Sequence, residues 1–183
     1  MLQNHPVAKT CNEGDSCCDS VRAPIPKVVH QIWIGPHPVP LKWIETWREQ
    51  HTTAYPDWKH MLWRDDDILA LLPPHLKRIY DKLDQLCLKA DVARYVILEK
   101  FGGVYLDADL AWLGGPGLDT VTAAQAVVAA FEATPSSGWG LDERISNAVI
   151  GVPRNHPLMT HVLNSIVNDF LALEQFLGED WSH

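Results

Sequence analysis

The stretch Phe101-Gly102-Gly103-Val104-Tyr105-Leu106-Asp107-Ala108-Asp109 decides the fold, because a diglycine leads into a short apolar run that ends in two alternate carboxylates. Strand side chains alternate between faces, so Asp107 and Asp109 are expected to point the same way while Ala108 points the other. Two neighbouring hard oxygen ligands suit Mg²⁺ or Mn²⁺ holding a diphosphate. The pattern therefore predicts a buried strand that opens into a metal site, with a solvated acidic loop as the plain alternative.

A long helix is expected before the diglycine, from about residue 84 to residue 100. Only Asp91 and Arg94 are charged within residues 90–98, and a spacing of three places them on one face. A helix that is apolar nearly all round needs its charges paired or used, so a functional pair is favoured over a surface ion pair. Gly102 and Gly103 should end the helix, because glycine accepts a left-handed backbone. The apolar positions at helical spacing are Leu86, Ala90, Ala93, Ile97 and Phe101, with Leu88, Val92 and Val96 opposite.

Strands and helices are predicted to alternate along the rest of the chain. Strands are expected at 28–34, 58–63, 126–131 and 147–152. Further helices are expected around Trp43, directly after the acidic run 65–67, from the proline pair 73–74 to about residue 82, and over 157–176. The run Asp65-Asp66-Asp67 is interpreted as an N-cap and first helical turn, not as a second metal site. Trp43 and Trp47 lie one turn apart, which favours core packing. This alternation predicts an α/β domain whose mainly parallel sheet has helices on both faces and binds ligands at the carboxyl ends of its strands.

Composition limits the classes of function. With 183 residues and 46% apolar content, the sequence predicts one domain over 24–183. A disordered tail over 1–23 should precede it; this tail contains Cys11, Cys17 and Cys18, and a stalk closed by a disulfide from Cys11 is the alternative. The net charge of −8 argues against a nucleic-acid partner. No apolar run reaches the ~18–20 residues of a membrane span, and the start of the chain lacks an apolar signal core. A cytoplasmic and a Golgi-associated location are both compatible with this pattern.

Several motifs, taken together and in order, resemble the DXD-containing sugar transferases, a family that includes Golgi mannosyltransferases, capsular polysaccharide transferases and glucosylating toxins. The resemblance rests on residues 89–95 and 102–109, on the earlier motifs 25–35 and 55–65, and on the later residues 146–151 and 156–158. It covers roughly residues 24–167 and implies a GT-A-like nucleotide-sugar transferase fold. The family's C-terminal segment, which closes over the donor, is expected to be missing or replaced by the short end of the chain around Trp181.

The resemblance also implies roles for individual residues around the donor. Trp33 would flank the nucleotide base, and Tyr105 would line the nucleotide site. Asp91 and Arg94 would contact the donor's sugar hydroxyls and phosphates, and Arg94 offers the planar fork that suits a phosphate. Asn147 is a candidate for the sugar or acceptor side, with hydrogen bonding to its own loop as an equal alternative.

At the reacting end, the resemblance makes Asp107 and Asp109 the catalytic and metal-binding pair. Asp107 would hold ribose and sugar hydroxyls, and Asp109 would coordinate Mn²⁺ or Mg²⁺ directly.

The implied activity is metal-dependent, retaining transfer of a mannose-, glucose- or galactose-type hexose from a UDP- or GDP-sugar to a hydroxyl of a glycan, lipid or protein. A catalytically degenerate module that binds nucleotide sugars or polysaccharides is the alternative. With little chain after the last helix, an open site, weak donor binding and competing hydrolysis are expected.

Overall fold

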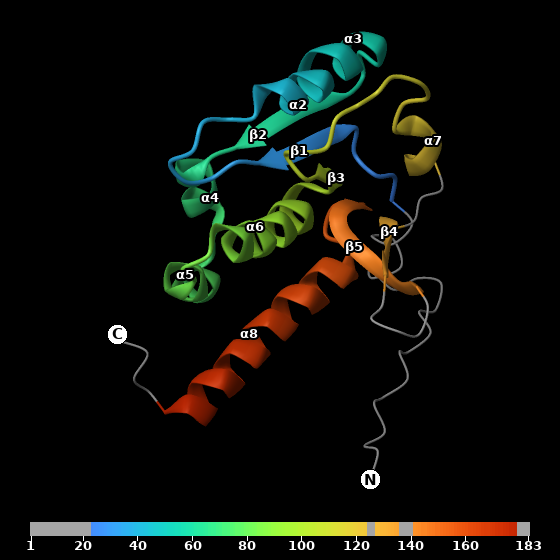
Figure 1. Cartoon of the computed structure of the whole chain (residues 1–183). Helices are drawn as coiled ribbons and strands as arrows, with labels where there is room; N and C mark the ends of the chain where they lie inside the picture. Colours follow the sequence, from blue (N-terminus) through green and yellow to red (C-terminus); the bar gives the residue numbers. More distant parts are fainter. Residues whose placement is uncertain (1–22, 124–126, 136–140, 179–183) are drawn as a thin grey trace.

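The computed structural model describes residues 23–123, 127–135 and 141–178 (Figure 1), so residues 1–22 of the predicted tail and Trp181 lie outside the described residues. Most expected elements are present, with boundaries shifted by a few residues. In chain order they are β1 (Val28–Ile32), α2 (Leu41–Glu45), the π-helix η1 (Thr46–His51), α3 (Thr52–Ala54), β2 (Lys59–Trp63), α4 (Asp65–Leu71), α5 (Pro74–Lys82), α6 (Leu86–Phe101), β3 (Gly103–Leu106), α7 (Asp119–Thr122), β4 (Val128–Pro135), β5 (Leu141–Val152) and α8 (Pro157–Leu177).

The strands form one five-stranded sheet in the order β2-β1-β3-β5-β4. β1 runs parallel to both β2 and β3, whereas β5 runs antiparallel to β3 and to β4. β5 is therefore the reversed strand, and the other four share one direction. The predicted α/β class with a mainly parallel sheet is confirmed, and its antiparallel part arises because β4 and β5 are joined by a short connection, which suits antiparallel pairing.

Helices cover both faces of the sheet, as predicted (Figure 1). On one face, α4, α5, α6 and α8 pack against side chains such as Ile32 of β1 and Tyr105 of β3. On the other face, Trp47 of η1 packs against Val29 and Val104. The central strands β1 and β3 are thus buried on both sides, which holds their carboxyl ends in fixed positions.

The diglycine connects α6 directly to the central strand β3. Gly102 and Gly103 have φ angles of 63° and 97°. A Cβ atom at Gly102 would lie 2.5 Å from the backbone nitrogen of Arg154, and one at Gly103 would lie 2.7 Å from the carbonyl oxygen of Val28. Both the backbone conformation and the close approach of neighbouring chain therefore require glycine here.

The three acids after β2 occupy the first turn of α4, which confirms their interpretation as a helix start. The N-cap itself is Arg64, not an acid, and its backbone N–H donates to Asp67 Oδ2 at 3.0 Å. Asp65 accepts a hydrogen bond from the backbone of Gly35 at 3.1 Å. This contact ties the loop that leaves β1 to the start of α4.

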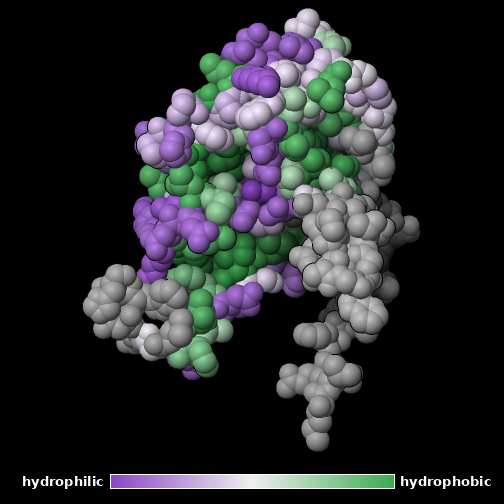
Figure 2. Space-filling view, in the orientation of Figure 1, coloured by the Kyte–Doolittle hydropathy of each residue, from purple (hydrophilic) through white to green (hydrophobic). Residues whose placement is uncertain are grey.

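Figure 2 shows apolar residues below the centre of the visible face, bordered by polar residues. Exposed apolar side chains on helices α6 and α8 include Leu88, Leu171, Leu173 and Phe176. Within the three described ranges, no helix combines the length and the hydropathy that crossing a membrane requires.

Candidate active site

A cavity of about 510 Å³ lies at the carboxyl ends of β1 and β3, where ligands were expected. Its lining comes from three parts of the chain: the end of β1 with the segment after it as far as Trp43, residues 86–94 of α6, and the end of β3 with the D-x-D turn. The lining residues are Ile32, Trp33, Ile34, His37, Trp43, Leu86, Cys87, Ala90, Arg94, Tyr105, Asp107, Ala108 and Asp109.

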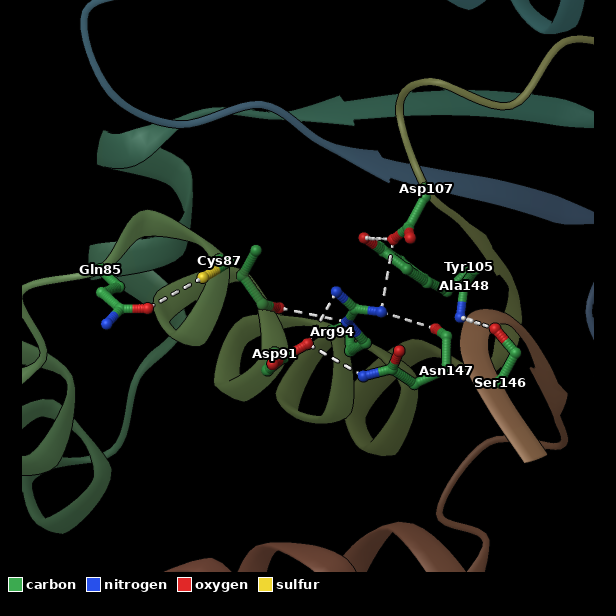
Figure 3. A network of polar contacts seen from close by, with 10 residues as sticks. Gln85, Cys87, Asp91, Arg94, Tyr105, Asp107, Ser146, Asn147 and Ala148 are labelled. Atoms are coloured by element: carbon green, nitrogen blue, oxygen red, sulfur yellow. Dashed lines mark hydrogen bonds and ion pairs between the residues drawn. The ribbon is translucent and has the colours of Figure 1, made fainter. Parts of the chain in front are cut away.

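Arg94 is the centre of the polar contacts beside this cavity (Figure 3). Its guanidinium nitrogen Nη2 lies 2.8 Å from Asp91 Oδ1, and Nη1 lies 3.3 Å from Asp107 Oδ1. Nη1 also donates to the carbonyl oxygen of Asn147 at 2.6 Å. The i,i+3 ion pair named as the alternative is therefore present, but Arg94 is only 5% exposed and so does not lie on a surface strip.

Tyr105 connects Arg94 to Asp107. Its ring lies under the guanidinium of Arg94, with 4.5 Å between the guanidinium carbon and the ring centroid, and its hydroxyl donates to Asp107 Oδ1 at 2.8 Å. Burial raises the pKa of Tyr105, and the negative charge of Asp107 also raises it, against the opposing effect of Arg94. Tyr105 is therefore a neutral hydrogen-bond donor, which holds one oxygen of the Asp107 carboxylate in place.

The two carboxylates of the D-x-D motif reach the cavity by a turn, not by strand alternation. β3 ends at Leu106, and the backbone N–H of Leu110 donates to the carbonyl oxygen of Asp107 at 3.1 Å. The argument from alternating strand faces is therefore wrong, although Asp107 and Asp109 both line the cavity. Asp109 is exposed and makes no hydrogen bond or ion pair with the described part of the chain.

Asp91 and Asn147 contact Arg94 from outside the cavity lining. The side-chain amide of Asn147 donates to Asp91 Oδ1 at 3.0 Å, the same oxygen that pairs with Arg94. Asn147 comes from β5, so the reversed strand supplies a contact to the site. In this arrangement Asp91 and Asn147 orient Arg94, and neither is among the residues that line the cavity.

Trp43 corrects one sequence-based expectation. Trp47 is buried in the core as predicted, but Trp43 is half-buried and lines the cavity. His37 and Cys87 also line it, and Trp33 is anchored by donating its indole N–H to the carbonyl oxygen of His37 at 2.9 Å. No local pattern distinguishes Trp43 from Trp47, because the two residues have the same spacing as two core positions.

The residues at the D-x-D turn fit the divalent ion that the sequence predicts. In the described ranges there is no group of three or more histidine, cysteine, aspartate or glutamate side chains that could enclose a metal. Mg²⁺ does not need such a cage, because it is commonly held by one or two carboxylates together with substrate phosphates. Asp107 and Asp109 supply such carboxylates at the cavity wall.

Comparisons with known proteins agree with this site. Residues 40–127 match the family model described as "Glycosyltransferase sugar-binding region containing DXD motif". A relative from Schizosaccharomyces pombe, inositol phosphoceramide mannosyltransferase 3, is 33% identical over 147 residues, which are 79% of this chain and 38% of that protein. Mannosyl phosphorylinositol ceramide synthase CSH1 from Saccharomyces cerevisiae is 27% identical over 146 residues, which are 78% of this chain and 35% of that protein.

The chain thus spans less than two fifths of the length of either relative. Among solved structures, the PaToxG glycosyltransferase has a TM-score of 0.47 and 15% sequence identity, over 87% of this chain and 68% of that one. The matched region contains α6, the diglycine and the D-x-D turn. It therefore includes the cavity-lining residues from Trp43 to Asp109. Residues 40–127 of this chain thus match the family of sugar transferases whose sugar-binding region contains a DXD motif.

Proposed function

We propose that this chain carries the donor site of a metal-dependent, retaining glycosyltransferase that moves a hexose from a nucleotide sugar to a hydroxyl group. One observation carries the proposal. Asp107 and Asp109, within the stretch that matches the DXD family model, line the same cavity as Trp33 and Arg94. The site therefore combines hard oxygen ligands, an aromatic ring and a buried cation, which are the groups that a nucleoside diphosphate sugar requires.

The aromatic side chains suit the nucleotide base. Trp33 and Trp43 both line the cavity and offer flat faces on which a base can stack. The hydrogen bond from the Trp33 indole to His37 holds this ring in one orientation. A ring that is held before binding loses little entropy when the base arrives.

The polar side chains suit the diphosphate and the sugar. Arg94 is held by Asp91 and Asn147, so its permanent charge stays at the cavity wall, where it can attract a phosphate oxygen. Asp107 has one oxygen bound by Tyr105 and Arg94, and its other oxygen can accept from ribose or sugar hydroxyls. Asp109 would be the direct ligand of Mn²⁺ or Mg²⁺. A bound ion of this kind offsets the negative charge that develops on the leaving nucleoside diphosphate.

The names of the two relatives narrow the proposed substrates. One name specifies mannosyl transfer to an inositol phosphoceramide, and the other specifies synthesis of a mannosyl phosphorylinositol ceramide. We therefore favour mannose over glucose and galactose as the transferred hexose, and a lipid-linked hydroxyl over a glycan or protein hydroxyl as the acceptor.

Release of the nucleoside diphosphate tests this proposal. The chain is incubated with GDP-mannose, UDP-glucose or UDP-galactose in Mn²⁺, with and without an inositol phosphoceramide acceptor. We expect the acceptor to enhance release of the nucleoside diphosphate and a chelator to abolish it. Asp109→Asn should also abolish release, without a change in the melting temperature of the protein. Asp66→Asn is the matched control, because it makes the same chemical change at an exposed position of α4 outside the cavity lining.

The same experiment separates the alternative function. Binding of a nucleotide sugar without any release, with or without an acceptor, would support the degenerate binding module. Full activity in Asp109→Asn or in the presence of chelator would refute the metal-site assignment.

A further inference from the structure

The turn that carries both carboxylates is held at its two ends by side chains from distant elements. At the first end, the carbonyl oxygen of Asp107 accepts a hydrogen bond from Gln31 Nε2 of β1 at 3.2 Å. At the other end, the carbonyl oxygen of Leu110 accepts one from Trp47 Nε1 of η1 at 2.9 Å. Both contacts go to the backbone, and neither Gln31 nor Trp47 is among the residues that line the cavity.

Gln31 is suited to a positioning role because it is completely buried and its amide has one permitted orientation. Its Oε1 accepts from His60 Nε2 at 2.9 Å, so its nitrogen faces Asp107. The carbonyl oxygen of Asp107 can only accept, which requires the nitrogen at that place. The buried amide thus has partners on both sides and cannot rotate without losing two hydrogen bonds.

Trp47 is equally restricted. It is 7% exposed, and the centroid of its ring lies 5.1 Å from that of His51. Both rings lie on the face of the sheet that packs against η1. The neighbouring Thr46 accepts a hydrogen bond from the backbone of Trp112 at 2.8 Å, just beyond the turn. The start of the π-helix η1 therefore presents two consecutive side chains to the segment that follows Asp109.

We propose that Gln31 and Trp47 are positioning residues that hold the backbone of residues 107–110, so that Asp107 and Asp109 present their carboxylates to the cavity together before the donor binds. The inference rests on the proposed function, because it concerns the residues assigned there to the metal and the donor. A short exposed turn would otherwise have to be ordered at the expense of binding free energy.

Two substitutions remove one contact each. Gln31→Met keeps the length of the side chain but cannot donate, and Trp47→Phe keeps an aromatic ring without the indole N–H. The matched control is Trp63→Phe, which removes an indole N–H that is donated to His30 Nδ1 at 3.1 Å in the same sheet and does not reach the turn. If Gln31→Met fails to fold, the pair Trp47→Phe and Trp63→Phe still decides the question.

Amide hydrogen exchange measures the turn directly in the metal-free protein. The reporter is the backbone N–H of Leu110, which donates to the carbonyl oxygen of Asp107. Loss of one buried hydrogen bond should accelerate its exchange about tenfold in Gln31→Met and Trp47→Phe, and leave it unchanged in Trp63→Phe. Unchanged exchange in the first two variants, or equal acceleration in all three, would overturn the inference.

Mn²⁺ binding in the presence of GDP, followed by the electron paramagnetic resonance of the free ion, measures the consequence. We expect the half-saturating Mn²⁺ concentration to rise about tenfold in Gln31→Met and Trp47→Phe and to stay constant in Trp63→Phe. Wild-type Mn²⁺ affinity in both turn variants would overturn the positioning role. If the wild-type chain itself binds no Mn²⁺ with GDP or UDP, the proposed function fails. The exchange rates then decide the inference alone.

Discussion

At the scale of single residues, Arg94 determines how the polar groups of the site are arranged. A charge that is 5% exposed must be compensated, and Arg94 is compensated by Asp91, Asp107 and the carbonyl oxygen of Asn147. These partners come from α6, the segment after β3, and β5. One guanidinium thus joins three separate parts of the chain, which a single ammonium group could not do with the same geometry.

Arg94→Lys tests this arrangement. We expect a loss of about 2–3 kcal/mol in the free energy of unfolding, because charge-assisted hydrogen bonds to the buried site are lost, and at least a tenfold weaker affinity for the donor. Urea unfolding and calorimetric titration of GDP-mannose with Mn²⁺ measure the two effects. Arg78→Lys on α5 is the control, because Arg78 pairs with Glu174 at the surface. We expect this variant to lose less than about 1 kcal/mol in the free energy of unfolding and to keep its affinity for the donor. Normal donor affinity in Arg94→Lys would remove Arg94 from the binding site.

At the scale of elements, the junction between α6 and β3 sets the position of the D-x-D turn. The backbone N–H of Gly102 donates to the carbonyl oxygen of Leu98 at 2.9 Å and closes the last turn of the helix, and Gly103 already belongs to the strand. Because no loop separates the helix from the strand, Arg94 and Asp107 are held at a constant separation.

Gly103→Ala should destabilise the protein by about 3 kcal/mol or more, since a positive φ angle and a backbone contact both oppose a Cβ atom. Gly114→Ala isolates the first of these effects. Gly114 also has a positive φ angle of 87°, but a Cβ atom there would meet nothing within 4 Å. We expect this control to cost about 1 kcal/mol. Equal losses in the two variants, measured by thermal unfolding, would show that the close packing at Gly103 contributes nothing.

At the scale of the whole molecule, the sheet buries an imidazole that must remain neutral. His30 is fully buried, its Nδ1 accepts from the indole of Trp63 and its Nε2 donates to the carbonyl oxygen of Gly102. Burial lowers the pKa of His30 to about 4, partly opposed by the hydrogen bond to Gly102. A second proton would have to sit on Nδ1, against the N–H group of Trp63.

The pH dependence of stability follows from this lowered pKa. The unfolded chain takes up the His30 proton near its ordinary pKa of 6.5, whereas the folded protein does so only near 4. The contribution of His30 to the free energy of unfolding should therefore be constant above about pH 6.5. Between pH 6.5 and pH 4 this contribution should fall by about 3 kcal/mol. Urea unfolding across this range measures the slope. In His30→Gln the free energy of unfolding should fall less steeply between pH 6.5 and pH 4. The same slope in wild type and variant would contradict the lowered pKa of His30.

The first 22 residues should be dispensable for the folded domain. The described core begins at Ile25, which is 4% exposed, and Lys27 pairs with Asp119 at 2.7 Å. Deletion of residues 1–22 should leave the melting temperature and the donor affinity unchanged. Deletion of residues 1–27 is the control, and it should lower the melting temperature because it removes both contacts. A loss of donor binding in the shorter deletion would disprove the predicted domain boundary.

Local patterns in the sequence were enough to predict α6, its end at the diglycine, the strand β3 and the class of the sheet. Periodicity within a helix or strand depends on residues a few positions apart, and glycine marks the places where the backbone is exceptional. The same patterns singled out Asp91 with Arg94 and, separately, Asp107 with Asp109. The resemblance to a family placed the two pairs around one donor and supplied their implied roles.

Tertiary structure alone decided how these residues meet. The contact of Gln31 with Asp107 spans 76 positions, and that of Arg94 with Asn147 spans 53. The reversal of β5, the turn after Leu106 and the place of Trp43 in the cavity likewise depend on which elements pack together. Contacts between residues so far apart in sequence leave no periodic signal, because they are selected by the burial of whole faces and not by local backbone preference.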